Sequence, residues 1–384
     1  MRAGPGKWRL VVPILLIVAI FLGNSLRERL TARAAPTLPR RTPAEVADWA
    51  AGPHPQPRSG FFDLSTNLGL GDFGTASGES GGSFVGLAAG TNRARVWEDG
   101  AGRRRIALLA PLQETDWYRE GDTTYVWHSN DVRVTKVDTP SVATAEATDG
   151  LITLLASGGT VETPDGLATR LLPLRQESTR LVLHEPSHVA GRPVYELGLI
   201  PDSKTSLVTE VAISVDADTG LPLRVAVETR GGTVAIRNEF TELTLRRPAE
   251  SHFTFRPPSE ARVADGETVV TSPDVFDDWR KHRERENAIE DVQSVAGVDR
   301  SLVRLATGGT GWDEVVMLSG FRPWRVEQLT RTAETVTGPY GTAQLVRTPV
   351  FNLLILNNGR IVAGAVTPAG LESAAAQGHG GTVR

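Results

Sequence analysis

The sequence predicts a mainly β protein of the α+β class, built on a curved antiparallel sheet and followed by a smaller C-terminal α+β module. Three observations predict this fold. From Gly60 onward, apolar and polar residues alternate with a period of two, which places the apolar side chains on one face of each strand. Turns rich in Asp, Asn and Gly separate the alternating runs. Helix signals are few and short, so the sheet carries most of the core.

Two hairpins are the clearest elements. Val211, Ile213 and Val215 alternate with polar residues, and the alternation resumes over residues 221–227 after an Asp/Gly-rich turn. Near the C-terminus, residues 351–356 run into Asn357-Asn358-Gly359 and return at residues 361–363. The Asn-Gly pair tolerates the positive φ angles that a tight two-residue turn demands.

The same alternation predicts the remaining strands. Within residues 234–245 the apolar phase slips between Phe240 and Leu243, which predicts a β-bulge. A loop is predicted in the Gly/Ser-rich segment 69–90. The other predicted strands are 61–66, 93–98, 105–110, 115–119, 123–128, 132–137, 180–184, 194–200 and 253–256. Short helices are predicted at 43–51, at 164–174 with Thr163 as N-cap, at 274–287, at 326–334 and from Pro368 onward.

Composition narrows the classes of function. The chain has 384 residues, 40% hydrophobic and 22% charged, which is typical of a globular protein. A net charge of −4 argues against general affinity for nucleic acid or for anionic membrane surfaces. The chain has no cysteine, which excludes disulfides, thiolate metal ligands and cysteine nucleophiles.

The N-terminus has the pattern of an export signal. Arg2, Lys7 and Arg9 precede an apolar run over residues 10–22, so residues 1–26 are predicted to be a signal anchor or a signal peptide. The small-x-small sequence Ala32-Arg33-Ala34 lies well beyond the apolar run, which favours an uncleaved anchor. We therefore expect a single anchor in the cell membrane with an extracytoplasmic body. The alternative is a body secreted after cleavage.

Domain boundaries follow from composition. Residues 27–59 are rich in proline and are predicted to be a tether. The sheet domain is expected over residues 60–258, and the polar stretch 259–297 is expected to be a linker with a helix. A small α+β module follows over residues 298–376, and residues 377–384 form a flexible tail.

Three short motifs resemble catalytic sequences but lack the required context. His184-Glu185-Pro186-Ser187-His188 matches the zinc-protease string, yet Pro186 disrupts a helix and the flanking residues alternate like strands. Gly78–Gly82 matches the nucleophile-elbow string inside a Gly/Ser-rich loop, and Gly308–Gly311 lacks the lysine of a phosphate-binding loop. We therefore predict no enzyme activity, no catalytic residue, no metal site and no cofactor.

Aromatic residues gather in the predicted strands 115–119 and 123–128. Tyr125 and Trp127 share one strand face, and Trp117 is placed opposite them across the turn at Gly121-Asp122. The cluster, which also includes Tyr118, is expected either to pack in the core or to line a pocket on the concave side of the sheet.

Several stretches, read together, resemble the LolA-like lipoprotein-carrier superfamily, which includes the RseB-type half-barrel. The actinobacterial group of membrane-anchored or secreted members is the most similar. The stretches include Asp99-Gly100, Glu114-Thr115-Asp116-Trp117 and Ser214 to Arg224, and the resemblance covers roughly residues 60–258. The other stretches are residues 90–97, 104–109, 121–127, 189–197 and, in the C-terminal part, 338–341 and 359–366.

The resemblance implies an unclosed half-barrel whose concave apolar face is covered by short helices. It also implies a binding protein of the cell envelope that holds a lipid, an acyl chain or a lipidated protein. The alternative is an extracytoplasmic signalling or scaffold protein, of the type that binds an anti-sigma factor, with an envelope or membrane partner and no small ligand. The residues expected to line the groove are Phe62, Leu64, Val96, Ile106, Leu108, Trp117, Tyr125, Trp127, Leu197, Val225 and Val227.

Overall fold

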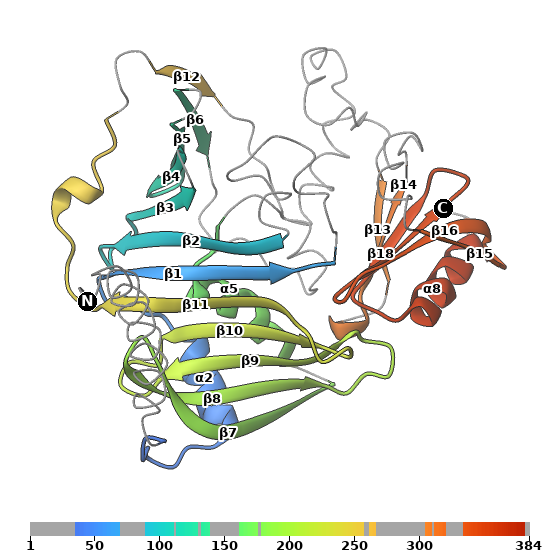
Figure 1. Cartoon of the computed structure of the whole chain (residues 1–384), viewed down its shortest axis with the longest axis horizontal. Coiled ribbons are helices and arrows are strands. Elements are labelled where there is room, and N and C mark those ends of the chain that lie inside the picture. The colour runs from blue at the N-terminus through green and yellow to red at the C-terminus, as the bar shows by residue number, and fades with distance from the viewer. Residues whose placement is uncertain are drawn as a thin grey trace, which may run out of the picture.

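The computed structural model describes most of the chain (Figure 1). The described residues are 35–69, 89–110, 113–129, 132–138, 161–175, 178–256, 261–265, 304–308, 311–319 and 333–380. The predicted N-terminal anchor, the Gly78–Gly82 motif, the predicted helix 274–287 and nearly all of the helix predicted over 326–334 lie outside these residues. Among the described helices, none is both long and apolar enough to cross a membrane.

The larger body is an unclosed sheet, in the order β12-β6-β5-β4-β3-β2-β1-β11-β10-β9-β8-β7. Neighbouring strands are antiparallel except at one edge, where β12 pairs in parallel with β6. Figure 1 shows β3 to β6 turning away from the direction of β7 to β11, so the sheet is strongly curved. The strands are β1 (Arg58–Asn67), β2 (Ala89–Glu98), β3 (Arg104–Ala110), β4 (Gln113–Glu120), β5 (Thr123–His128), β6 (Arg133–Asp138), β7 (Thr179–Val189), β8 (Arg192–Pro201), β9 (Val208–Asp216), β10 (Pro222–Thr229), β11 (Val234–Thr244) and β12 (Arg262–Asp265).

Two short helices pack on one face of this sheet, α2 (Pro43–Ala51) and α5 (Pro164–Leu171). α2 begins with a capping box, in which Thr42 accepts from the Glu45 backbone and the Glu45 carboxylate accepts from the Thr42 backbone N–H. α5 has Thr163 as its N-cap and continues into the 3₁₀ helix η3 (Leu172–Arg175). Figure 1 shows both helices on the far side of strands β7 to β11.

The helix-side face carries two adjoining apolar clusters. In the first, α2, α5 and η3 pack against β7 to β11, with Leu171, Leu197 and Val225 essentially inaccessible to solvent. In the second, Phe62, Val96 and Ile106 pack with neighbours from β1 to β4 and from β7, β8, β10 and β11. The two clusters together extend from β7 to β4.

A second sheet follows, with the strand order β13-β14-β18-β17-β16-β15 and the helix α8 (Pro368–Gly380). Its strands are β13 (Arg304–Gly308), β14 (Val315–Ser319), β15 (Glu334–Gly338), β16 (Gly341–Arg347), β17 (Asn352–Leu356) and β18 (Ile361–Gly364), with the 3₁₀ helix η6 (Gly311–Asp313) before β14. Trp312 joins the core of the larger body and donates to Thr179 Oγ1 at 2.7 Å. An isolated bridge links Ser206 to Val366, so the two sheets form one packed unit along the β8–β9 connection.

The predicted fold class is confirmed: the protein is mainly β, with an unclosed antiparallel sheet, few short helices and a second sheet near the C-terminus. The bulge predicted between Phe240 and Leu243 lies at Thr241, where the register against β1 shifts. The strand predicted at 253–256 was wrong, because this segment leaves the sheet after the 3₁₀ helix η4 (Glu250–His252). The body also extends beyond the predicted range, because α2 packs in its core and β12 joins its edge.

Buried ion pairs connect the elements. Arg58 at the start of β1 is 3% exposed and pairs with Glu98 of β2 and with Asp165 in the first turn of α5. Asp216 at the end of β9 is inaccessible to solvent and pairs with Arg192 of β8. Removal of one partner from such a pair leaves the other charge buried without compensation.

We expect Arg58→Ala to lower the free energy of unfolding by about 3–5 kcal/mol, because it leaves the Glu98 and Asp165 carboxylates unpaired. The matched control is Arg93→Ala, since the Arg93 side chain is 50% exposed and its pairs with Asp63 and Glu242 are long. That control should change stability by about 0.5 kcal/mol or less. Urea denaturation of both variants tests the contrast, and equal losses would contradict it.

The stability that the buried Asp216 carboxylate contributes depends on pH. Burial by itself raises the pKa of the Asp216 carboxyl, but hydrogen bonds from Arg192 and Thr219 more than offset it, and the pKa lies below its ordinary value of 3.8. The ionised carboxylate therefore stabilises the fold above pH 3.8, and this contribution is lost as the pH falls through the lowered pKa. Asp216→Asn should cost about 2–3 kcal/mol at pH 7. This loss of unfolding free energy should become smaller in acid. Denaturation curves at several pH values measure it, and a loss that does not change with pH would contradict the lowered pKa of Asp216.

Candidate functional site

Nine of the eleven residues predicted to line a groove lie on the helix-side face. Cross-strand register places them together: Phe62 pairs with Ala94 of β2 and with Phe240 of β11, and Ile106 pairs with Trp117. Eight of the nine are fully buried, and Leu64 is partly buried against both clusters. The nine are Phe62, Leu64, Val96, Ile106, Leu108, Trp117, Leu197, Val225 and Val227.

Tyr125 and Trp127 lie on the opposite, outer face. The two-residue turn at Gly121 and Asp122 pairs Trp117 with Val126, and it pairs Tyr118 with Tyr125. Residues that face each other across a hairpin share one face of the sheet, so Trp117 is separated from both Tyr125 and Trp127 by the sheet. The placement of Trp117 opposite these two aromatic residues was therefore wrong.

The helix-side face divides into two halves. The described helices α2 and α5 pack mainly against β7 to β11, and α5 also reaches β1 through the Asp165–Arg58 ion pair. Val96, Ile106, Leu108 and Trp117 form an apolar strip over β2 to β4, and their cluster includes no described side chain from α2 or α5. All four side chains are buried.

The outer face carries a row of alternating guanidinium groups and aromatic rings. Arg95 lies 4.9 Å from the ring centre of Phe61 and 4.6 Å from that of Trp97. Arg105 lies 4.8 Å from both Trp97 and Tyr118, which continues the row into β4. We call Phe61, Arg95, Trp97, Arg105, Tyr118 and Tyr125 the outer row.

The connection from β11 to β12 crosses this face. His252 stacks on Trp97 with ring centres 4.9 Å apart, and Phe255 contacts Tyr118 at 4.8 Å and Tyr125 at 5.6 Å. Phe253 is buried against Trp97 and Ala107. Figure 1 shows the connection running from β11 past β3 and β4 to β12. We call residues 250–256 the strap, because their rings hold this connection on the outer face.

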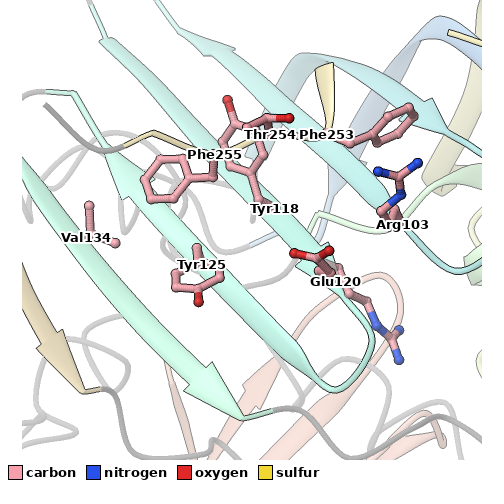
Figure 2. A pocket seen from close by; sticks show the side chains of 9 residues that line it. Arg103, Tyr118, Glu120, Tyr125, Val134, Phe253, Thr254 and Phe255 are labelled. Carbon is pink, nitrogen blue, oxygen red and sulfur yellow. The ribbon is translucent and has the colours of Figure 1, made fainter. Parts of the chain in front are cut away.

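A cavity of about 440 Å³ lies between the strap and strands β4 to β6. Figure 2 shows Phe255 beside Tyr118 and Tyr125, with Glu120 and Val134 also at the cavity wall. Arg103, also in the lining, is neutralised by Asp99 and Glu250. The walls thus combine aromatic rings with a few polar groups, as ligand sites commonly do.

Electrostatics under the outer row centre on Asp116. Its carboxylate accepts two hydrogen bonds from Arg105, at 3.0 Å and 3.1 Å. Burial raises the pKa of Asp116 to about 6, although Arg105 opposes the rise, and nearby Glu114 adds to it. Burial also lowers the pKa of His252, together with the positive charges of Arg105 and Arg95. Both groups therefore favour their neutral forms more than they would in water.

The histidines of the zinc-protease string lie on a strand. His184 and His188 are both in β7, which bulges between His184 and Ser187. His184 Nε2 lies 2.6 Å from the Glu210 carboxylate, and no cluster of three or more potential metal ligands occurs among the described residues. The strand predicted at 180–184 is confirmed, and it continues through the string to Val189, so the turn lies at Ala190-Gly191.

Sequence reasoning missed the strap and the guanidinium groups of the outer row. The signal was present: Arg93, Arg95 and Trp97 alternate on β2, so their side chains share one face. Phe253 and Phe255 are separated by one residue, and this spacing predicted a strand. The same spacing also fits an irregular segment in which both rings contact the sheet. Only the fold shows which sheet face these rings contact.

The raised pKa of Asp116 makes the stability of the fold depend on pH. Because its pKa is raised, the stabilisation from the neutral carboxyl is complete below about pH 4 and is lost as the pH rises through about 6. Over this pH range, the free energy of unfolding of the wild-type protein should fall by about 1–2 kcal/mol relative to that of Asp116→Asn, after allowance for solvent screening. Denaturation of both proteins at pH 4 and pH 7 measures it. A difference that does not change with pH would contradict the raised pKa.

Comparisons with known proteins give distant likenesses. No protein-family model matches the sequence, and no curated protein matches it significantly. The Pseudomonas aeruginosa MucA/MucB complex matches with 17% identity over 86% of this chain and 97% of that chain, at a TM-score of 0.41. LprF from Mycobacterium bovis matches with 10% identity over 56% of this chain and 100% of that chain, at a TM-score of 0.28.

A LolA superfamily protein from Nitrosomonas europaea matches with 9% identity over 56% of this chain and 99% of that chain, at a TM-score of 0.24. The chain is therefore similar to MucB, LprF and LolA superfamily structures at low identity. These TM-scores are too low for the matches to assign a function to this chain, and the actinobacterial group remains a prediction.

Proposed function

We propose that the protein is a non-catalytic binding protein of the cell envelope that holds an acyl chain, as a lipid or as part of a lipidated protein, on the helix-side face. The observation that carries the proposal is the continuous apolar strip over β2 to β4, whose buried cluster includes no described side chain from α2 or α5. Its residues Val96, Ile106, Leu108 and Trp117 present adjacent side chains from three neighbouring strands.

Such a strip suits an extended apolar ligand. Each buried CH₂ group of an acyl chain contributes about 0.8 kcal/mol, so contact along several strands gives useful affinity without specific hydrogen bonds. Charged groups are available at one end, where Arg104 of β3 pairs with Glu98 of β2. A polar rim of this kind can accommodate a headgroup.

The proposed location rests on the N-terminal sequence. Basic residues followed by the apolar run over residues 10–22 favour export with the body outside the cytoplasm. The chain has no cysteine, and the body has an extensive apolar core with paired charges at the buried Arg58 and Asp216. Either an anchored or a secreted form is compatible with this proposal.

A second candidate function is binding of an envelope or membrane protein partner without a small ligand. The outer row favours it, because Arg, Trp and Tyr are the residues that most often dominate protein–protein interfaces. The two candidates use opposite faces of one sheet, so experiments can separate them.

The test uses the full chain and a fatty acid that carries a photoreactive diazirine, followed by mass-spectrometric mapping of the cross-linked residues. We expect cross-links on β2 to β4 at helix-side positions. Ala94→Leu adds bulk to the strip and should reduce these cross-links several-fold, at a stability cost of about 1–3 kcal/mol.

The matched control is Ala107→Leu, because Ala107 is an equally buried alanine on the adjacent strand but belongs to the outer-face cluster. It should leave the cross-links unchanged. Both variants are checked for folding by circular dichroism. Cross-links confined to residues 10–22, or spread evenly over the body, would refute the acyl-chain proposal and leave the protein-partner candidate.

A further inference from the structure

Arg95 differs from the other arginines of the outer face. Arg93 pairs with Asp63 and Glu242, Arg103 with Asp99 and Glu250, and Arg105 with Asp116 and Glu114. Within the described residues, Arg95 forms no hydrogen bond and no ion pair. It is therefore a cation of this face that has no carboxylate partner in the described part of the chain.

The Arg95 guanidinium is nevertheless held in place. It lies between the rings of Phe61 and Trp97, at 4.9 Å and 4.6 Å from their centres. These contacts fix the plane of a group that otherwise has large rotamer freedom. Its Nε atom is buried without a hydrogen-bond partner among the described residues, so the Nη groups are the ones available to a ligand. A fixed and unsatisfied guanidinium is organised in advance to accept an anion.

The surroundings select among anions. Asp63, Glu114 and Glu242 share this face and are already paired with Arg93 or Arg105, so a polyanion such as nucleic acid or an anionic vesicle surface would meet one unpaired cation here and not a row of them. A single carboxylate matches the single unpaired charge of Arg95. Apolar surface for the residues beside that carboxylate is provided by Phe61 and by Leu109, the exposed large hydrophobic residue of the described part of the chain.

We propose that Arg95 is the anchor of a binding site for a partner protein, and that it accepts one carboxylate from an Asp or Glu side chain flanked by apolar residues. The planar guanidinium would bind this carboxylate through two hydrogen bonds, with the ligand segment lying across β1 to β3. The site rests on the second candidate function, and it does not depend on acyl-chain binding, because the outer row and the helix-side strip are on opposite faces.

The experiment measures binding of the full chain to a fluorescent ten-residue peptide panel, each peptide with one Glu among Leu, Val and Thr residues. A matched Gln peptide accompanies each Glu peptide. We expect the best Glu peptide to bind about tenfold more tightly than its Gln counterpart. Arg95→Gln should remove this difference. Arg95→Lys should recover only part of it, because lysine lacks the bidentate geometry.

Arg93→Gln is the matched control, because Arg93 lies on the same face of the same strand but is already paired. It should leave the affinity for the Glu peptide within about twofold. Circular dichroism verifies that each variant is folded. The ¹⁵N resonances of the Arg95 Nη–H groups should shift on addition of the Glu peptide, which reports direct contact, because the Nε atom is buried.

Three results would overturn the proposal. These are equal binding of the peptide by wild type and Arg95→Gln, absence of binding to every peptide, and Arg95-dependent binding of phosphatidylglycerol vesicles in preference to peptide. Photoreactive fatty-acid labelling of Arg95→Gln separates the two proposals. If Arg95→Gln loses peptide binding but is still labelled by the fatty acid, the acyl-chain site is intact. If Arg95→Gln loses only the fatty-acid labelling, the result contradicts the acyl-chain site and leaves the peptide site standing.

Discussion

The pairing of β1 with both β2 and β11 is the constraint on which the rest of the structure depends. β1 joins the arm β2 to β6 with the arm β7 to β11, and both pairings are antiparallel. Because side chains alternate between faces, a slip of one residue at this seam would place one arm's apolar residues on the wrong side. The bulge at Thr241 corrects the register and lets Phe62 and Phe240 meet on the helix side, with ring centres 6.0 Å apart.

Much of the fold could be predicted from the sequence because its signals are local. Alternation located β1 to β11 but not β12 to β16, the cap at Thr163 located α5, and the Asn-Gly turn located the last hairpin, where Gly359 has φ of 79°. The phase slip after Phe240 even located the bulge. Each of these features is determined by residues close together in the chain.

The candidate site was harder to predict because it depends on which face a residue occupies. The two-residue turn at Gly121 and Asp122 pairs Trp117 with Val126, so the local sequence already places Trp117 on the face opposite Tyr125 and Trp127. The strap could not be found in the same way. Phe253 and Phe255 contact strands more than a hundred residues earlier in the chain, and alternation alone does not identify such partners.

The parallel pairing of β12 with β6 joins the two arms by a second covalent route. The chain leaves β11 beside the seam, crosses the outer face through the strap and ends on the far edge of the other arm. A flatter sheet would move β3 to β5 relative to β11, and it would therefore disturb the contacts of Phe253 and Phe255 with these strands. The ring contacts on the outer surface are in this way coupled to the curvature that sets the width of the inner face.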